Sequence, residues 1–163
     1  MTTYHPSFIP SETANEYLTI IEKELVWTKF KPSPKSRLVS RWAPGGSKLS
    51  DSIMEALVGQ LQDTCGVSVE GTFLNLYANG QDYCPYHKDR YGMDVFTLSL
   101  GASRDFLLKR DGTGQSATKT TLRSGDVYFM PRSIHTDHKH SIPRRKNHEG
   151  KRISVVFFTQ PTS

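Results

Sequence analysis

A histidine and a carboxylate stand one residue apart in this sequence, as His87-Lys88-Asp89. In extended backbone, residues i and i+2 point to the same side, so both side chains could face one ligand. Joined by a distant histidine, they would form the two-histidine, one-carboxylate set that leaves three positions open on a non-heme Fe(II). The spacing alone is a weak signal, because it arises by chance and histidine is more often a surface or core residue than a ligand.

Three histidines could supply the distant ligand: His135, His138 and His140. His138 and His140 have the same parity within an expected strand, so a register shift of two residues would exchange their places. The residues by themselves leave this choice open.

Short strands are expected to position these groups. After Gly66 the sequence changes to runs rich in β-branched and aromatic residues, separated by turn residues such as Asp111-Gly-Thr-Gly114 and Ser124-Gly-Asp126. The expected strands are 72–77, 95–100, 105–110, 118–122, 127–130, 138–142 and 153–159. Short strands at this spacing favour a sandwich, a barrel or a jelly roll.

Two amphipathic helices are expected before Gly66. Apolar residues recur at helical spacing over residues 12–26 and again from Ile53 to Leu61. The second helix would open on a capping box, Ser52-x-x-Glu55, and end at Gly66. Residues rich in Pro, Gly and Lys at 31–37 and 43–47 are expected to be loops. We therefore predict an α+β, mainly β fold: a double-stranded β-helix, or jelly roll, with two N-terminal helices packed on it.

The length of 163 residues fits a single domain over 1–163, with helices and a short substrate lid in 1–69 and a catalytic jelly roll in 70–160. Two cysteines and the lack of a signal-peptide pattern favour a soluble protein of a reducing intracellular compartment, cytoplasmic or nuclear. No apolar run approaches the roughly 18 residues that span a bilayer, so we expect no membrane partner. We also expect a monomer.

The net charge of +5 and the pI near 9.2 favour an anionic partner. Between Arg132 and Arg152, seven basic residues stand against two acidic ones. This run is either a solvated loop face or a rim that contacts phosphates, and the second interpretation gains weight only beside an active site.

Several motifs together carry a resemblance. Their order is Asn75-Leu-Tyr77, His87-Lys-Asp89, Gly125-Asp126-Val, His140-Ser-Ile-Pro143 and Arg152-Ile-Ser154. Over roughly residues 70–160 the chain resembles the AlkB family of 2-oxoglutarate/Fe(II) dioxygenases. The resemblance implies that His87, Asp89 and His140 bind Fe(II), and it favours His140 over His138 because of the Ser-Ile-Pro that follows. The co-substrates would be 2-oxoglutarate and O2.

The resemblance also implies a 2-oxoglutarate site. Arg152 would form a bidentate salt bridge with the distal carboxylate, because its planar fork matches a carboxylate and stays protonated. Tyr77 would donate to the same carboxylate, Asn75 would help to hold the end nearer iron, and Ser154 would lie beside them. One departure stands out: the family's second arginine on the last strand is Phe158 here.

The resemblance implies oxidative demethylation of N-alkylated bases in DNA or RNA, with formaldehyde, succinate and CO2 as products. Trp42 would stack on the extruded base, and Arg37 and Tyr86 are further substrate candidates. We find no wedge residue besides Trp42 between Trp27 and Leu49, which favours single-stranded nucleic acid. The alternatives are the same chemistry on a protein or small molecule, and a non-catalytic jelly roll that binds nucleic acid.

Overall fold

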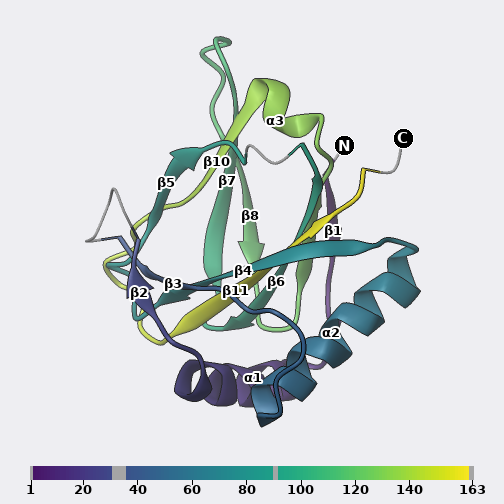
Figure 1. The fold of residues 1–163 in the computed structure, drawn as a ribbon. Helices are drawn as coiled ribbons and strands as arrows, with labels where there is room; N and C mark the ends of the chain where they lie inside the picture. Colours follow the sequence, from purple (N-terminus) through teal and green to yellow (C-terminus); the bar gives the residue numbers. More distant parts are fainter. Residues whose placement is uncertain (1, 31–35, 90–91, 162–163) are drawn as a thin grey trace.

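Two β-sheets form the body of the molecule (Figure 1). The computed structural model describes residues 2–30, 36–89 and 92–161. Within them, the larger sheet has the strand order β1-β9-β6-β11-β4-β3-β2 and the smaller sheet the order β5-β10-β7-β8, both antiparallel throughout. The larger sheet consists of β1 Thr3–His5, β9 Val127–Met130, β6 Asp94–Gly101, β11 Arg152–Thr159, β4 Val69–Tyr77, β3 Leu38–Ser40 and β2 Thr28–Lys29. The smaller sheet consists of β5 Cys84–His87, β10 His138–Ile142, β7 Arg104–Arg110 and β8 Thr118–Leu122.

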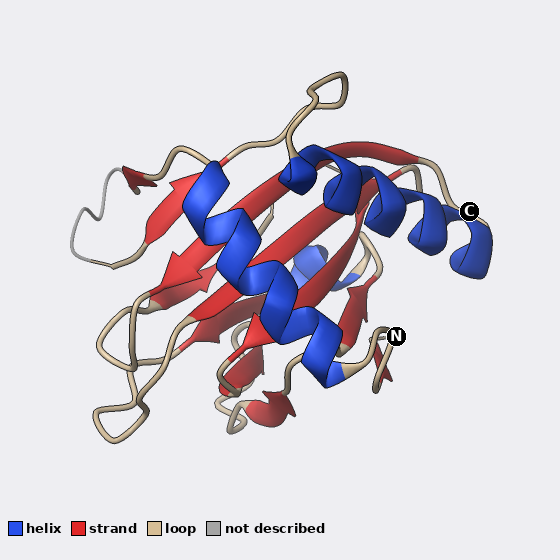
Figure 2. Cartoon of the chain, turned by 90° about the horizontal axis from the view of Figure 1, so that it is seen from below, coloured by secondary structure: helices blue, strands red, loops and turns tan. Residues whose placement is uncertain are grey.

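Two helices, α1 Ser11–Glu24 and α2 Leu49–Cys65, lie across the outer face of the larger sheet (Figure 2). Both bury one apolar stripe, as helices that pack on a sheet must. The buried apolar residues are Ala14, Ile21, Ile53, Met54, Leu57 and Leu61. Side chains from the outer faces of β4, β6 and β11 complete this first core. The predicted α+β, mainly β fold with two N-terminal helices is thus confirmed. No helix of the described ranges is long and apolar enough to cross a bilayer.

The predicted capping box of the second helix is wrong. The helix begins at Leu49, and Asp51 accepts a hydrogen bond from the backbone N–H of Lys48 at 2.9 Å. Asp51 therefore satisfies a free donor at the helix start, and the observed capping residues Lys48 and Asp51 lie four residues before the predicted Ser52 and Glu55. Gly66 ends the helix in the left-handed conformation, at φ 64°, as predicted.

All seven predicted strands are present, most with ends shifted by one to three residues. The strands that the sequence did not predict are β1, β2, β3 and β5, and the short helix α3 Ile134–Asp137 was also missed. Each is four residues or shorter, too brief for a periodic pattern. The predicted loop at 43–47 is confirmed, and residues 31–35 of the other predicted loop lie outside the described residues.

A second core fills the space between the two sheets. It is built from Tyr77, Cys84, Val95, Phe106, Leu122, Tyr128, Met130 and Ile142. Because β11 lies between β4 and β6, Arg152 is level with Tyr77, and Ser154 with Asn75 and Ser99. Alternation along these strands turns all of these side chains to the inner face. The inner face is thus polar at the Arg152 end, within an otherwise apolar interior.

Candidate metal centre and co-substrate pocket

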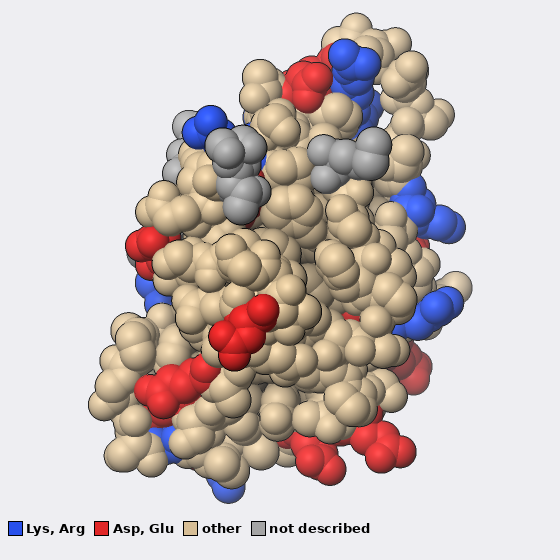
Figure 3. Space-filling model, turned by 90° about the vertical axis from the view of Figure 1, so that its right-hand side faces the viewer, with Lys and Arg blue, Asp and Glu red and all other residues tan. Residues whose placement is uncertain are grey.

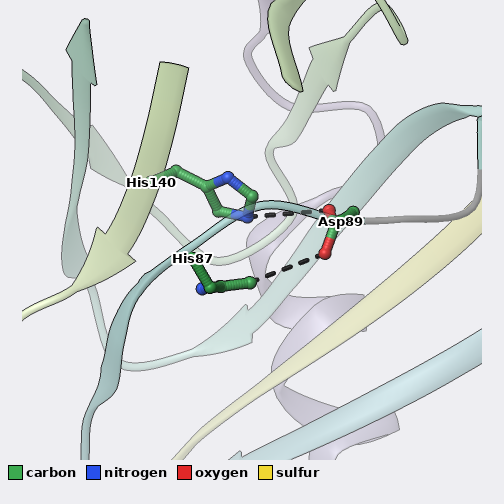
Figure 4. Close-up of side chains that lie close together, drawn as sticks. All are labelled: His87, Asp89 and His140. Carbon is green, nitrogen blue, oxygen red and sulfur yellow. Dashed lines mark ion pairs between the residues drawn. The ribbon is translucent and has the colours of Figure 1, made fainter. Parts of the chain in front are cut away.

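His87, Asp89 and His140 meet at one edge of the inner space. His87 ends β5, Asp89 follows it, and His140 of β10 is the direct cross-strand partner of His87. One ligand atom from each residue lies within 4.8 Å of the others. The Nε2 atoms of His87 and His140 lie 3.5 and 3.6 Å from the two carboxylate oxygens of Asp89 (Figure 4). These three side chains could hold one metal ion on one face and leave its other positions open.

The two rival histidines lie differently. His138, at the start of β10, has its Nδ1 2.7 Å from Oδ1 of its neighbour Asp137, and it is outside the three-residue group. His135 of α3 is closer, with Nε2 3.9 Å from Asp89, but it does not belong to the group either. The geometry therefore favours His140 as the third ligand.

The protonation of the group suits metal binding. Burial, together with the charge of His87, lowers the pKa of His140 to about 3, so its imidazole is neutral and able to ligate. Burial opposes ionisation of both His87 and Asp89, but their mutual hydrogen bond and the other polar groups around them together outweigh it. The pKa of His87 rises to about 10, with a further contribution from Cys84, and that of Asp89 falls. A metal ion would therefore displace a proton from His87.

A short contact orients the ring of His87. Its Nδ1 lies 2.8 Å from the carbonyl oxygen of Pro85, which can only accept. Nδ1 therefore carries a proton, and Nε2 is turned to Asp89. Outer contacts of this kind fix the tautomer of metal-binding histidines.

Arg152 lies in the same cavity and is 1% exposed. Its Nη2 donates to Ser99 Oγ at 2.9 Å, whereas Nε and Nη1 have no hydrogen-bond partner in the part of the chain that the structure describes. No carboxylate of the described ranges forms an ion pair with Arg152. A buried cation without a counter-ion is costly, and the free edge of the guanidinium matches an incoming carboxylate.

Tyr77 lies beside Arg152, whose guanidinium carbon is 5.3 Å from the centre of the Tyr77 ring. Burial raises the pKa of Tyr77 to about 12, so its hydroxyl stays protonated and able to donate. Asn75 donates to Ser154 Oγ at 2.9 Å and accepts from Nε of Arg37 at 2.7 Å. The structure thus brings Arg37, Asn75, Tyr77, Arg152 and Ser154 into one cavity of about 330 Å³ with the three metal-ligand candidates.

The mouth of the cavity is aromatic, which the sequence analysis did not predict. Phe30, Phe73 and Phe158 line it, with Arg37 stacked 4.3 Å from the Phe30 ring and Arg41 5.2 Å from the Phe73 ring. Phe73 shares strand parity with Asn75, so alternation along β4 could have identified it. Phe30 lies within the stretch in which no wedge residue was expected, and only the fold brings it to the mouth.

Two substrate candidates lie outside this cavity. Trp42 does not line it; it packs against the core beneath the helices, and its Nε1 donates to Asp51 Oδ1 at 2.9 Å. The predicted stacking of Trp42 on a base therefore needs correction, because the indole is held on α2, on the opposite face of the sheet. Tyr86 is 42% exposed and lies outside the mouth, beside Lys139.

The sequence of residues 28–157 matches the model of the 2OG-Fe(II) oxygenase superfamily. The DNA oxidative demethylase ALKBH2 of Arabidopsis thaliana is 26% identical over 162 residues, covering 82% of this chain and 48% of the relative. Human ALKBH2 is 25% identical over 117 residues, covering 64% of this chain and 45% of the relative. The chain thus spans about half the length of the curated relatives that it matches.

Solved structures show the same fold. The structure of OsALKBH1 superposes with a TM-score of 0.70 at 14% identity, covering 98% of this chain and 96% of that one. A prolyl-4-hydroxylase of Pseudomonas putida superposes with a TM-score of 0.66 at 13% identity, covering 99% and 93%. Because the family model matches residues 28–157, which are most of the chain, this chain belongs to the 2OG-Fe(II) oxygenase superfamily, and its sequence is similar to the AlkB-like members of that superfamily.

Proposed function

We propose that this protein is an Fe(II)- and 2-oxoglutarate-dependent dioxygenase that demethylates N-alkylated bases in single-stranded DNA or RNA. The observation that carries the proposal is the pairing, within one cavity, of a two-histidine, one-carboxylate group with a buried arginine that has no counter-ion among the described residues. The first fits Fe(II) and the second fits a carboxylate, so the cavity suits both partners of this chemistry.

Each residue then has a distinct task. His87, Asp89 and His140 hold the metal on one face. Arg152 and Tyr77 bind the distal carboxylate of 2-oxoglutarate, with Ser99 fixing the guanidinium from behind at 2.9 Å. Asn75 and Ser154 form a polar wall beside the co-substrate, and Arg37 keeps the amide of Asn75 in place through the bond to its carbonyl oxygen.

Bound iron, 2-oxoglutarate and O2 together supply the oxidation of a C–H bond, with succinate and CO2 as products. Insertion of one oxygen atom into an N-methyl group gives an N-hydroxymethyl group. The C–N bond then breaks, the nitrogen regains a proton, and formaldehyde leaves. The second oxygen atom of O2 ends in succinate, so that atoms and electrons balance.

The aromatic mouth supports a base as the substrate. The rings of Phe30, Phe73 and Phe158 offer flat apolar surfaces, and Arg41 adds a positive charge. Base stacking on aromatic side chains tolerates any sequence, and cations attract the phosphates beside it. The named activity of the ALKBH2 relatives, DNA oxidative demethylation, agrees with this interpretation.

The test is formaldehyde release from a panel of methylated oligonucleotides, each offered as a single strand and as a duplex at one salt concentration. We expect release that depends on both Fe(II) and 2-oxoglutarate, and faster turnover of single strands, because a duplex base must first be extruded. His87→Ala, Asp89→Ala and His140→Ala should each abolish it.

Release from no member of the panel, with hydroxylation of a peptide or small molecule instead, would replace this function by the same chemistry on another substrate. Oligonucleotide binding without any 2-oxoglutarate turnover would identify a non-catalytic nucleic-acid-binding protein. Equal rates on single strands and duplexes would remove the strand preference alone.

A further inference from the structure

Two lysines face each other on the outer surface of the smaller sheet. Lys139 of β10 is the direct cross-strand partner of Lys109 of β7, and both are exposed. Like charges directly opposite on neighbouring strands destabilise a sheet. His140, next to Lys139, points inward to the metal centre, so alternation places the lysines on the outside.

The acidic groups nearby are already engaged. Asp111 forms an ion pair with Lys88, and Asp137 lies 3.7 Å from Arg110 and 2.7 Å from His138. Neither Lys109 nor Lys139 forms an ion pair with any residue of the described ranges. The positive charge of this lysine pair is therefore available to a partner.

An exposed aromatic ring adjoins the pair. Tyr86 of β5 is 42% exposed, and Lys109 Nζ lies 6.0 Å from the centre of its ring. Cations interleaved with an open ring are the combination that single-stranded nucleic acids use, with phosphates on the cations and a base on the ring.

The surface is continuous with the cavity. Tyr86 and Lys139 line an outer hollow together with Lys109 and Arg110. The same two residues line a second hollow that reaches His87 and Asp89 at the mouth. By contrast, the side of the molecule that carries β1 and the C-terminus has Lys and Arg mainly along its edges and acidic side chains nearer its centre (Figure 3).

We propose that Tyr86, Lys109 and Lys139 form an outer platform that binds the strand next to the base in the cavity. Two phosphates contact the lysines, and one neighbouring base stacks on Tyr86. The proposal rests on the proposed function and adds to it the path of the strand: out of the mouth, past Lys139 and along the outer face of β10 and β7.

The experiment measures binding of a short, unmethylated, fluorescently labelled single strand to the full chain by anisotropy at several salt concentrations. For Lys109→Gln/Lys139→Gln we expect weaker binding and a log–log salt slope shallower by about 1.4, since each lost phosphate contact on a single strand removes about 0.7. Tyr86→Ala should lower affinity about fivefold or more and Tyr86→Phe only slightly, because the phenyl ring still stacks.

The matched control removes two exposed charges on the opposite side. Lys23 lies on α1, and Arg123 adjoins Ser124, whose hydroxyl bonds Asn15 of α1 at 2.6 Å. Lys23→Gln/Arg123→Gln should leave the affinity and the slope near those of the unchanged protein. Equal loss in the two double variants would overturn the platform, as would a Tyr86→Ala variant that binds normally.

Because the probe carries no methyl group, these results do not depend on demethylation. Platform-dependent binding without formaldehyde release from any methylated strand would contradict the proposed function and leave the platform standing. Formaldehyde release together with oligonucleotide binding that does not change in the Tyr86, Lys109 and Lys139 variants would support the proposed function and contradict the platform. Tighter, lysine-dependent binding of a poly-glutamate peptide than of the oligonucleotide would assign the surface to acidic proteins and overturn our proposal.

Discussion

Two buried arginines lie against the same tyrosine, and their guanidinium groups are satisfied to different degrees. The guanidinium carbons of Arg104 and Arg152 lie 5.2 and 5.3 Å from the centre of the Tyr77 ring, and the two residues are 2% and 1% exposed. Arg104 donates to the carbonyl oxygens of Asn79, Asp82 and Pro143 at 3.2, 2.8 and 2.7 Å. Arg152 donates to Ser99, and its Nε and Nη1 are buried without a partner among the described residues, whereas Arg104 has one such nitrogen, Nε.

We attribute the difference to a structural role for Arg104 and to the proposed 2-oxoglutarate-binding role of Arg152. Arg104 joins two segments through their backbone oxygens. Asn79 and Asp82 lie between β4 and β5, and Pro143 directly follows β10. Arg152 keeps its free edge directed into the cavity. Burial does not distinguish the two residues, because both are buried. The number of guanidinium nitrogens that have a hydrogen-bond partner does distinguish them.

The largest expected effect is that of Arg104→Met on stability. Three part-buried hydrogen bonds from a charged donor would be lost, so the free energy of unfolding should fall by about 3–5 kcal/mol. Urea denaturation followed by circular dichroism measures this. A loss below about 1 kcal/mol would show that the three contacts carry little of the fold's stability.

Arg152→Met should have the reverse profile. Its removal deletes an uncompensated buried charge, so the free energy of unfolding should stay the same or rise by up to about 2 kcal/mol. The affinity for 2-oxoglutarate should fall on the order of 100-fold, because two charge-assisted hydrogen bonds are lost. A destabilised variant that still binds 2-oxoglutarate would exchange the roles of the two arginines.

Arg152→Lys should have a smaller effect. A lysine keeps the charge but cannot form two parallel hydrogen bonds, so we expect about tenfold weaker 2-oxoglutarate binding with little change in stability. Calorimetric titration with 2-oxoglutarate shows whether the affinity depends on the positive charge alone or also on the two parallel hydrogen bonds. An unchanged affinity would mean that charge alone suffices at this position.

The smallest expected effect concerns Trp42. Trp42→Phe removes the hydrogen bond to Asp51 and should cost about 1 kcal/mol of stability. The KM for a methylated oligonucleotide should not change, whereas Phe73→Ala, at the mouth, should raise it. A raised KM in Trp42→Phe would restore Trp42 to the substrate site.

Much of the site could be predicted from the sequence because it lies on regular strands. Alternation along β4 and β11 places Asn75, Tyr77, Arg152 and Ser154 on one face, and the family motifs identify them. Arg104 could not be recognised, since its acceptors are backbone oxygens distant in the sequence. Lys109 and Lys139 form a pair only through the register of β7 and β10. Trp42 was misassigned because a tryptophan between loop residues fits a lid and a core equally well.

The most direct test of the proposed site is metal-dependent binding of 2-oxoglutarate, measured calorimetrically without oxygen. With Fe(II) present, the unchanged protein and His138→Ala should bind 2-oxoglutarate alike, while His140→Ala and Arg152→Met should bind it far more weakly. Circular dichroism of each variant shows that it is folded. Binding that survives in His140→Ala and is lost in His138→Ala would contradict the ligand assignment, and equal binding by all four proteins would contradict the site itself.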